Sequence, residues 1–195
     1  MQAHGIRTIV DLRNDHEVAA VPDVEPRPAG LTSVHVPLDD LADTEFWDHC
    51  WSNDLDGSPL YYQPFLDRKA ERCAAAVAAI ARAEPGGVVL HCGGGRDRTG
   101  LISLLLLALV RAEPEDIVSD YELSNVRLRA LWAARGEPDE SREIEAILAR
   151  KNTSARALVL EVLSSLDADA CLRTAGLPDA DVAAIRTRLV GALES

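Results

Sequence analysis

The chain has few cysteines and no apolar run long enough to cross a membrane. Its four cysteines are scattered over 195 residues without a C-x-x-C pair, which argues against a disulfide-stapled secreted domain. The N-terminus lacks a basic segment followed by an apolar core, so no secretory signal is recognisable. The apolar stretch 101–110 is shorter than the roughly 20 residues that a membrane-spanning helix needs. We therefore expect a cytoplasmic protein without stable membrane insertion.

A surplus of basic residues is also absent. The net charge of −12 argues against nucleic acid or a broad anionic membrane surface as the main partner. The scattered histidines show no metal-ligand spacing, so no metal site is expected. Hydrophobic residues make up 47% and charged residues 27%, which is typical of a globular protein, and no repeat is visible. These features predict one domain over residues 1–195.

Residues 88–100 carry the clearest pattern in the chain, Val-Val-Leu-His-Cys-Gly-Gly-Gly-Arg-Asp-Arg-Thr-Gly. The β-branched run 88–90 follows a Pro-Gly-Gly breaker and predicts a short buried strand. The Leu-rich run 101–110 predicts a buried helix. Cys92 is therefore expected where the strand ends, and Thr99 where the helix begins.

A glycine loop between a strand and a helix favours anion binding. Successive backbone N–H groups converge there, and the free N–H groups of the first helical turn add positive potential. The same dipoles would lower the pKa of Cys92 well below that of a free thiol and make it a nucleophile at neutral pH. Arg98 can fold back over the loop and present its planar fork to two oxygens of a bound phosphate. The spacing predicts covalent phosphoryl transfer, and the alternative is a turn with a buried, inert cysteine.

The spacing His-Cys-x-x-Gly-x-x-Arg-Thr-Gly resembles the signature of the cysteine-dependent protein tyrosine phosphatases. The matching residues are His91, Cys92, Gly95, Arg98, Thr99 and Gly100. Four further blocks, residues 5–13, 37–41, 120–125 and 172–177, are similar to a bacterial family of tyrosine and dual-specificity phosphatases. The resemblance implies hydrolysis of phosphotyrosine, often also of phosphoserine, phosphothreonine or phosphoinositides. A phosphorylated protein or a phosphoinositide would then be the partner, with no metal or other cofactor needed.

Two features depart from that family. Arg96 stands where the family usually has lysine, which keeps the charge and changes its geometry. We expect its side chain to reach the pocket rim and bind a second negatively charged group of the substrate, such as a further phosphate of an inositol lipid. The chain also begins only a few residues before its first predicted central strand. The N-terminal edge of the family fold is therefore expected to be missing, which would leave an exposed sheet edge.

Each residue of the signature has an expected role. Cys92 would attack phosphorus and form a phosphocysteine intermediate. Thr99 would donate its hydroxyl to the departing sulfur or cap the helix, and His91 would brace the loop. The phosphate oxygens would be held by the loop residues, which are Gly93, Gly94, Gly95, Arg96, Asp97, Arg98 and Thr99.

The leaving oxygen needs a proton, and two aspartates are candidates for the general acid. Asp97 lies inside the loop beside Arg98, although it could merely brace the loop. Asp40 follows the second predicted strand and matches an acidic position of the family, although it is one charge among many there. We place Asp97 ahead of Asp40.

Two other classes of function remain possible at this signature. One is a catalytically weak module that binds phosphorylated ligands. The other is redox chemistry at Cys92, with Cys50 or Cys73 as the resolving thiol. The arginine clamp argues against redox chemistry as the main role.

The remaining pattern predicts an α/β fold that resembles the tyrosine phosphatase fold, with a central sheet flanked by helices and a helical C-terminal layer. Strands are predicted at 6–12, 34–38 and 88–90, with the first of them central. The acidic, aromatic segment 39–64 is either a binding loop or a surface excursion. The predicted helices cover 65–82, a stretch opening at 114, 144–148, 155–166 and 179–193.

Overall fold

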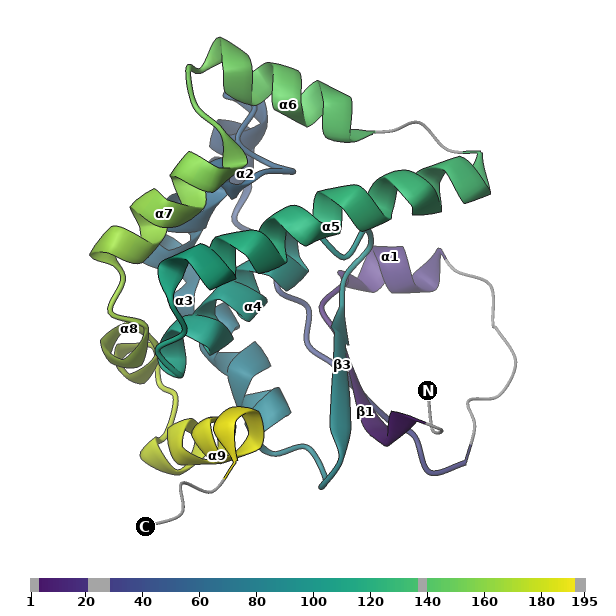
Figure 1. The fold of residues 1–195 in the computed structure, drawn as a ribbon, viewed down its shortest axis with the longest axis vertical. Helices are drawn as coiled ribbons and strands as arrows, with labels where there is room; N and C mark the ends of the chain where they lie inside the picture. Colours follow the sequence, from purple (N-terminus) through teal and green to yellow (C-terminus); the bar gives the residue numbers. More distant parts are fainter. Residues whose placement is uncertain (1–3, 21–28, 137–139, 192–195) are drawn as a thin grey trace.

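A small parallel sheet lies at one side of the molecule and helices cover it (Figure 1). The computed structural model describes residues 4–20, 29–136 and 140–191. Strand β1 (Ile6–Asp11) is central, and it pairs in parallel with β2 (Thr32–His35) on one side and β3 (Gly87–His91) on the other. The expected α/β class and the central place of the first strand are confirmed.

The second strand ends three residues earlier than predicted. It stops at His35, because Pro37 has no N–H to offer the neighbouring strand. The chain still runs beside β1 after that point, where the N–H of Val36 donates to the carbonyl of Asp11 at 2.9 Å and that of Leu38 to Leu12 at 3.2 Å. This extension carries the residues after Leu38 to the carboxyl ends of β1 and β3.

The described part of the chain contains more helix than predicted. The segment 39–64 is not an open loop, because it forms α2 (Thr44–Ser52) and the short 3-10 helix η2 (Pro59–Tyr61). A seven-residue helix, α8 (Ala168–Thr174), was also not predicted, since two turns give little periodicity. The other helices are α1 (Asp15–Ala19), α3 (Tyr62–Ala81), α4 (Asp97–Leu109), α5 (Pro114–Arg135), α6 (Glu140–Arg150), α7 (Ala155–Ser165) and α9 (Asp179–Val190).

An aromatic cluster fixes α2 against α3. Phe46 of α2 meets Phe65 of α3 edge-on at 6.0 Å between ring centroids, and Trp47 of α2 lies 6.4 Å from Phe65. Phe65 in turn meets Tyr61 edge-on at 5.7 Å. All four rings are buried. Edge-to-face pairs of this kind contribute roughly 0.5–1.5 kcal/mol beyond the burial of their area.

Helix α4 is the central helix of the core and follows β3 directly. Its residues Leu101, Ile102 and Leu105 are fully buried. A helix that is apolar on all sides must be surrounded, and α4 contacts α3, α5, α8 and α9. The start of α4 is therefore held rigidly at the end of the sheet where the strands terminate (Figure 1).

One lysine is buried in this core. Lys69 of α3 is 3% exposed, and its ammonium lies 2.7 Å from the carboxylate of Asp43 and 3.4 Å from that of Asp40. Hydrogen bonds from Lys69 and Arg68 lower the pKa of Asp43 to about 2. Asp43 also caps α2, because its side chain accepts a hydrogen bond from the N–H of Phe46. These contacts join the start of α2 to the middle of α3.

We predict that Asp43→Asn lowers the melting temperature at pH 7 by several degrees. Asparagine can still cap the helix, but Lys69 then has only the more distant carboxylate of Asp40 as a charged partner. The pKa of Asp43 is lower in the folded than in the unfolded chain, so its charge stabilises the fold above about pH 4, and this contribution is lost as the pH falls toward 2. Thermal denaturation from pH 7 to pH 2 should show the two proteins converging.

The matched control is Glu45→Gln, which removes an exposed partner of Arg68 and leaves Lys69 untouched. It should melt within a degree or two of the parent, in line with the small contribution of surface ion pairs. A melting difference between Asp43→Asn and the parent that stays constant down to pH 2 would contradict the assigned role of this ion pair.

Candidate active site

The glycine loop lies between β3 and α4, as the pattern predicts. Strand β3 ends at His91, Cys92 follows at once, and α4 begins at Asp97. The thiol of Cys92 is almost completely buried and accepts a hydrogen bond from the backbone N–H of Gly95 at 3.2 Å. Gly95 has a φ of +79°, a backbone conformation that residues other than glycine rarely adopt. The turn at Gly95 thus directs its backbone N–H toward the sulfur.

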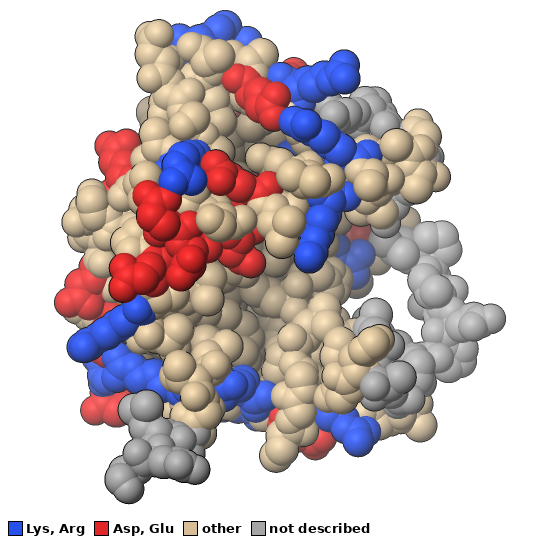
Figure 2. Space-filling view, viewed as in Figure 1, with Lys and Arg blue, Asp and Glu red and all other residues tan. Residues whose placement is uncertain are grey.

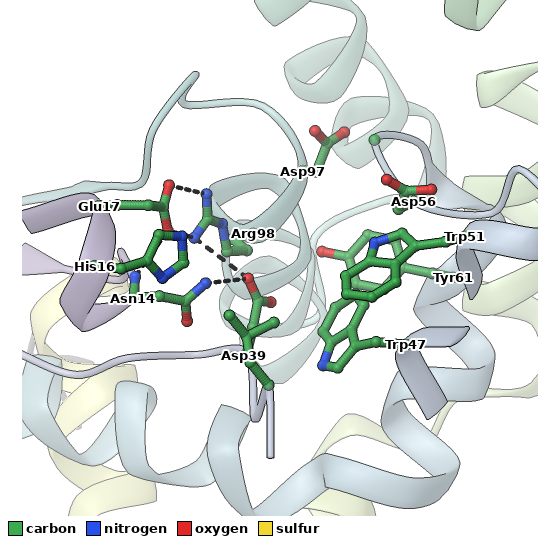
Figure 3. A pocket seen from close by; sticks show the side chains of 12 residues that line it. Asn14, His16, Glu17, Asp39, Trp47, Trp51, Asp56, Tyr61, Asp97 and Arg98 are labelled. Atoms are coloured by element: carbon green, nitrogen blue, oxygen red, sulfur yellow. Dashed lines mark hydrogen bonds and ion pairs between the residues drawn. The ribbon is translucent and has the colours of Figure 1, made fainter. Parts of the chain in front are cut away.

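Arg98 lies beside Gly93 of this loop, and two carboxylates hold its side chain (Figure 3). Its Nη1 lies 2.5 Å from Glu17 Oε2, and its Nη2 lies 2.8 Å from Glu17 Oε1. Nη1 also lies 3.3 Å from Asp39 Oδ2. The hydrogen bonds from Arg98 lower the pKa of Glu17, and together with the charge of Asp39 they raise the pKa of Arg98 despite its burial. The guanidinium therefore stays charged and fixed in direction.

A cavity of about 280 Å³ opens beside Arg98. Figure 3 shows polar side chains on one side, with Trp47, Trp51 and Tyr61 facing them on the other. The two tryptophan rings stack with centroids 6.1 Å apart. The lining residues are Asn14, His16, Glu17, Asp39, Leu41, Trp47, Trp51, Asp56, Gly57, Tyr61, Asp97 and Arg98.

Asp97 and Asp40, the two acids named from the sequence, are separated by the fold. Asp97 lines the cavity, and its carboxylate accepts hydrogen bonds from Arg96 Nε at 3.1 Å and Nη2 at 3.4 Å. Asp40 is not part of the cavity wall, because its carboxylate pairs with Lys69 and with Arg72 at 3.3 Å. The geometry thus places Asp97, and not Asp40, beside Arg98.

Asp39 lines the cavity, whereas its neighbour Asp40, a candidate acid from the sequence, does not. Burial raises its pKa, although the charge of Arg98 and a hydrogen bond from Asn14 at 3.1 Å oppose the rise. Successive residues after a strand point in opposite directions, so one of the pair turns inward and the other outward. One feature of the sequence could have indicated Asp39: it follows a predicted strand, and binding sites in parallel sheets form at the carboxyl ends of the strands.

Glu17 was also missed by the sequence analysis. It lies in the short helix α1, and Asn14 and Glu17 form a capping box there. A Cβ added at Gly93 would lie 3.1 Å from Glu17 Oε1, so this carboxylate sits directly against the glycine loop. No local pattern marks it, because its partner Arg98 lies 81 residues further along the chain.

The side chain of Arg96 does not reach the cavity rim, so that expectation is wrong. Arg96 is 5% exposed and turns to the opposite side of the loop, where it helps to line a second cavity with Tyr121 of α5 and Ser141 of α6. Its guanidinium is held by the carboxylate of Asp97, one residue further on. This pairing draws the side chain inward and away from the pocket mouth.

The remaining signature residues support the loop. Nδ1 of His91 lies 3.1 Å from the carbonyl oxygen of Cys92, in keeping with a bracing role. The expectation that Thr99 caps the helix is wrong, because α4 begins two residues earlier, at Asp97, and the hydroxyl of Thr99 has no hydrogen-bond partner within the described residues. A Cβ added at Gly100 would lie 2.7 Å from the hydroxyl of Tyr62, which itself donates to the carbonyl of Asp97 at 2.9 Å. Gly100 thus lets α4 pack closely against α3.

The described part of the chain holds no group of three or more histidine, cysteine, aspartate or glutamate side chains arranged to bind a metal ion. None of its helices is both long and apolar enough to cross a membrane.

A glycine loop that holds a cysteine at the end of a parallel strand, with an arginine beside it, is an arrangement typical of cysteine-based phosphate-binding sites. The tyrosine phosphatase family matches residues 1–191, and the chain belongs to this family. A tyrosine-protein phosphatase of Nostoc commune is 29% identical over 145 residues, covering 73% of the chain. The match spans 46% of that relative's own length.

The aromatic side of the cavity yields a prediction about ligand binding. Trp51 is half exposed, and its ring stacks on Trp47 at the open side of the cavity. We predict that Trp51→Ala weakens binding of phosphotyrosine about three- to tenfold and leaves the affinity for tungstate unchanged, because tungstate fills the loop without touching the wall. Calorimetric titration of both ligands into a Cys92→Ser background measures this. An equal loss for both ligands would contradict a ring-binding role for Trp51.

Proposed function

We propose that this protein hydrolyses phosphomonoesters, with phosphotyrosine as the main substrate class, through a phosphocysteine intermediate. The observation that carries the proposal is the glycine loop that holds Cys92 together with Arg98, whose Nη2 would lie 3.4 Å from a Cβ added at Gly93 of the same loop. Membership of the tyrosine phosphatase family supports it.

In the first step the sulfur of Cys92 attacks phosphorus in line while the bond from phosphorus to the leaving oxygen breaks. The loop N–H groups and Arg98 hold the other phosphoryl oxygens, on which negative charge spreads. Asp97 donates a proton to the leaving oxygen, so a phenol departs. In the second step water attacks phosphorus, Asp97 accepts the proton of that water, and the phosphorus–sulfur bond breaks to regenerate the thiolate and release phosphate.

The cavity supports an aromatic phosphate better than a multiply phosphorylated lipid. Its described lining holds four carboxylates, from Glu17, Asp39, Asp56 and Asp97, against one arginine, Arg98. Each further phosphate of a ligand would meet this negative field, whereas a phenyl ring would meet Trp47 and Trp51. On the face drawn in Figure 2, acidic side chains gather over α5 and α7, which does not favour docking to an anionic membrane.

Redox chemistry is less well supported than hydrolysis. Burial raises the pKa of Cys50 and, more strongly, that of Cys73, so neither thiol is a ready thiolate. Both are buried in the core and would have to leave it to resolve an oxidised Cys92. A binding module without turnover is the second candidate, and the assay below separates it from an enzyme.

The direct test is hydrolysis of p-nitrophenyl phosphate and a phosphotyrosine peptide in the presence of EDTA. We predict turnover by the parent and its loss in Cys92→Ser, because a serine hydroxyl stays protonated in the site. Arg98→Lys should lose at least about 100-fold in kcat, since one ammonium cannot replace a two-pronged donor. Full activity of Cys92→Ser would refute the mechanism, and a parent that binds phosphotyrosine without turnover would indicate a binding module.

The assignment of the general acid gives a separate prediction. If Asp97 protonates the leaving oxygen, Asp97→Asn should lose about 100-fold more rate on phenyl phosphate, a poor leaving group, than on 2,4-dinitrophenyl phosphate. Asp40→Asn, whose carboxylate faces Lys69, serves as the control and should show no such dependence. Asp39→Asn tests the other carboxyl of the cavity. If Asp39→Asn shows the leaving-group dependence and Asp97→Asn does not, Asp39 is the acid.

A further inference from the structure

We infer that Tyr61 is a further catalytic residue whose hydroxyl donates a hydrogen bond to an oxygen of the bound phosphoryl group. The inference rests on the proposed function and adds to it a donor that the signature does not contain. Tyr61 is the last residue of η2 and lines the same cavity as Asp97 and Arg98.

The hydroxyl of Tyr61 has no hydrogen-bond partner within the described residues, and the side chain is only 3% exposed. A buried hydroxyl without a partner loses its hydrogen bonds to water and gains none in return. Such a group in a native fold calls for an explanation, and an absent ligand is one. Its neighbour Tyr62 shows the contrast, because its hydroxyl donates to the carbonyl of Asp97 at 2.9 Å.

The direction of the side chain identifies that ligand. Figure 3 shows the oxygen of Tyr61 pointing into the cavity, toward the side on which Arg98 lies and away from the two tryptophan rings. The charges of Asp97, Asp39 and Cys92 all act on this hydroxyl and, with burial, raise its pKa well above the ordinary value. It therefore remains protonated at neutral pH and is a donor rather than a base.

The ring of Tyr61 is held firmly enough for the hydroxyl to be preorganised. It packs edge-on against Tyr62 at 5.3 Å and against Phe65 at 5.7 Å, and it lies at 6.4 Å from Trp47. A fixed donor in a site shielded from water stabilises developing charge more than a mobile one does. A phosphoryl group bound in the loop carries spreading negative charge on its outer oxygens and supplies the missing acceptor.

The test compares Tyr61→Phe with Tyr62→Phe, two adjacent variants that each lose one hydroxyl and keep the ring. Four quantities are measured for each protein: the melting temperature without ligand, kcat and KM for p-nitrophenyl phosphate, and the dissociation constant for tungstate. For Tyr61→Phe we expect an unchanged or raised melting temperature, because the lost hydroxyl had no partner. Its kcat should fall roughly 10- to 100-fold and its tungstate affinity should weaken severalfold. For Tyr62→Phe we expect a lower melting temperature.

The outcomes separate this inference from the proposed function. Parental kcat and tungstate affinity in Tyr61→Phe would overturn the inference and leave the phosphatase proposal intact. A lower melting temperature together with lower kcat in Tyr61→Phe would assign the hydroxyl a structural role and also overturn it. A parent that binds tungstate without turnover would refute the proposed function, and the tungstate affinities would still decide the role of Tyr61. A parent that binds no tungstate would overturn both.

Discussion

The partly buried ion pair between Arg98 and Glu17 is the interaction on which the site depends. A guanidinium that is mostly withdrawn from water must have partners, and here Glu17 binds both of its terminal nitrogens while Asp39 approaches one of them. These residues come from α1, from the chain after β2 and from α4. The ion pair therefore forms only when the carboxyl ends of the parallel strands are assembled. It holds the arginine across the loop before any phosphate arrives.

The loop itself is supported from within the core. Helix α4 is apolar on every side, and the signature residue Gly100 allows Tyr62 to approach closely enough to hold the carbonyl of Asp97. The ring of Tyr62 packs against Tyr61, and Tyr61 packs against Phe65 of the aromatic cluster. The same set of aromatic rings thus has two roles, because it packs the core and also forms the wall against which a substrate ring would lie.

The charges of the site reconcile an acidic protein with an anionic substrate. The net charge of −12 does not exclude a phosphate site, because the loop N–H groups and Arg98 act locally in a region shielded from water. The carboxylates of Glu17, Asp39, Asp56 and Asp97 surround this arginine in the cavity. Under the proposed function their negative charge would oppose a second phosphate on the ligand. Arg96 lines the second cavity and balances the charge of Asp97, one of these four carboxylates.

The sequence by itself determined the features that depend on neighbours in the chain. The β-branched runs at β1 and β3, the apolar run of α4, and the spacing from His91 to Gly100 are local patterns, and each structure they predict is formed mainly by its own residues. The sequence also placed Cys92 directly after a strand. It misplaced the end of β2 and did not reveal α8, because a proline among strand residues and a seven-residue helix leave little periodicity to interpret.

Only the tertiary structure decided which distant side chains meet at the loop. It selected Asp39 over Asp40, brought Glu17 to Arg98 across 81 residues, and buried Arg96 away from the cavity. It also showed that the hydroxyl of Tyr61 points into the cavity without a partner within the described residues. Such choices turn on the direction of single side chains, and that direction is set by packing between elements far apart in the chain. A linear pattern carries hydrophobic period and residue type, but not which face of a loop or strand end will look inward.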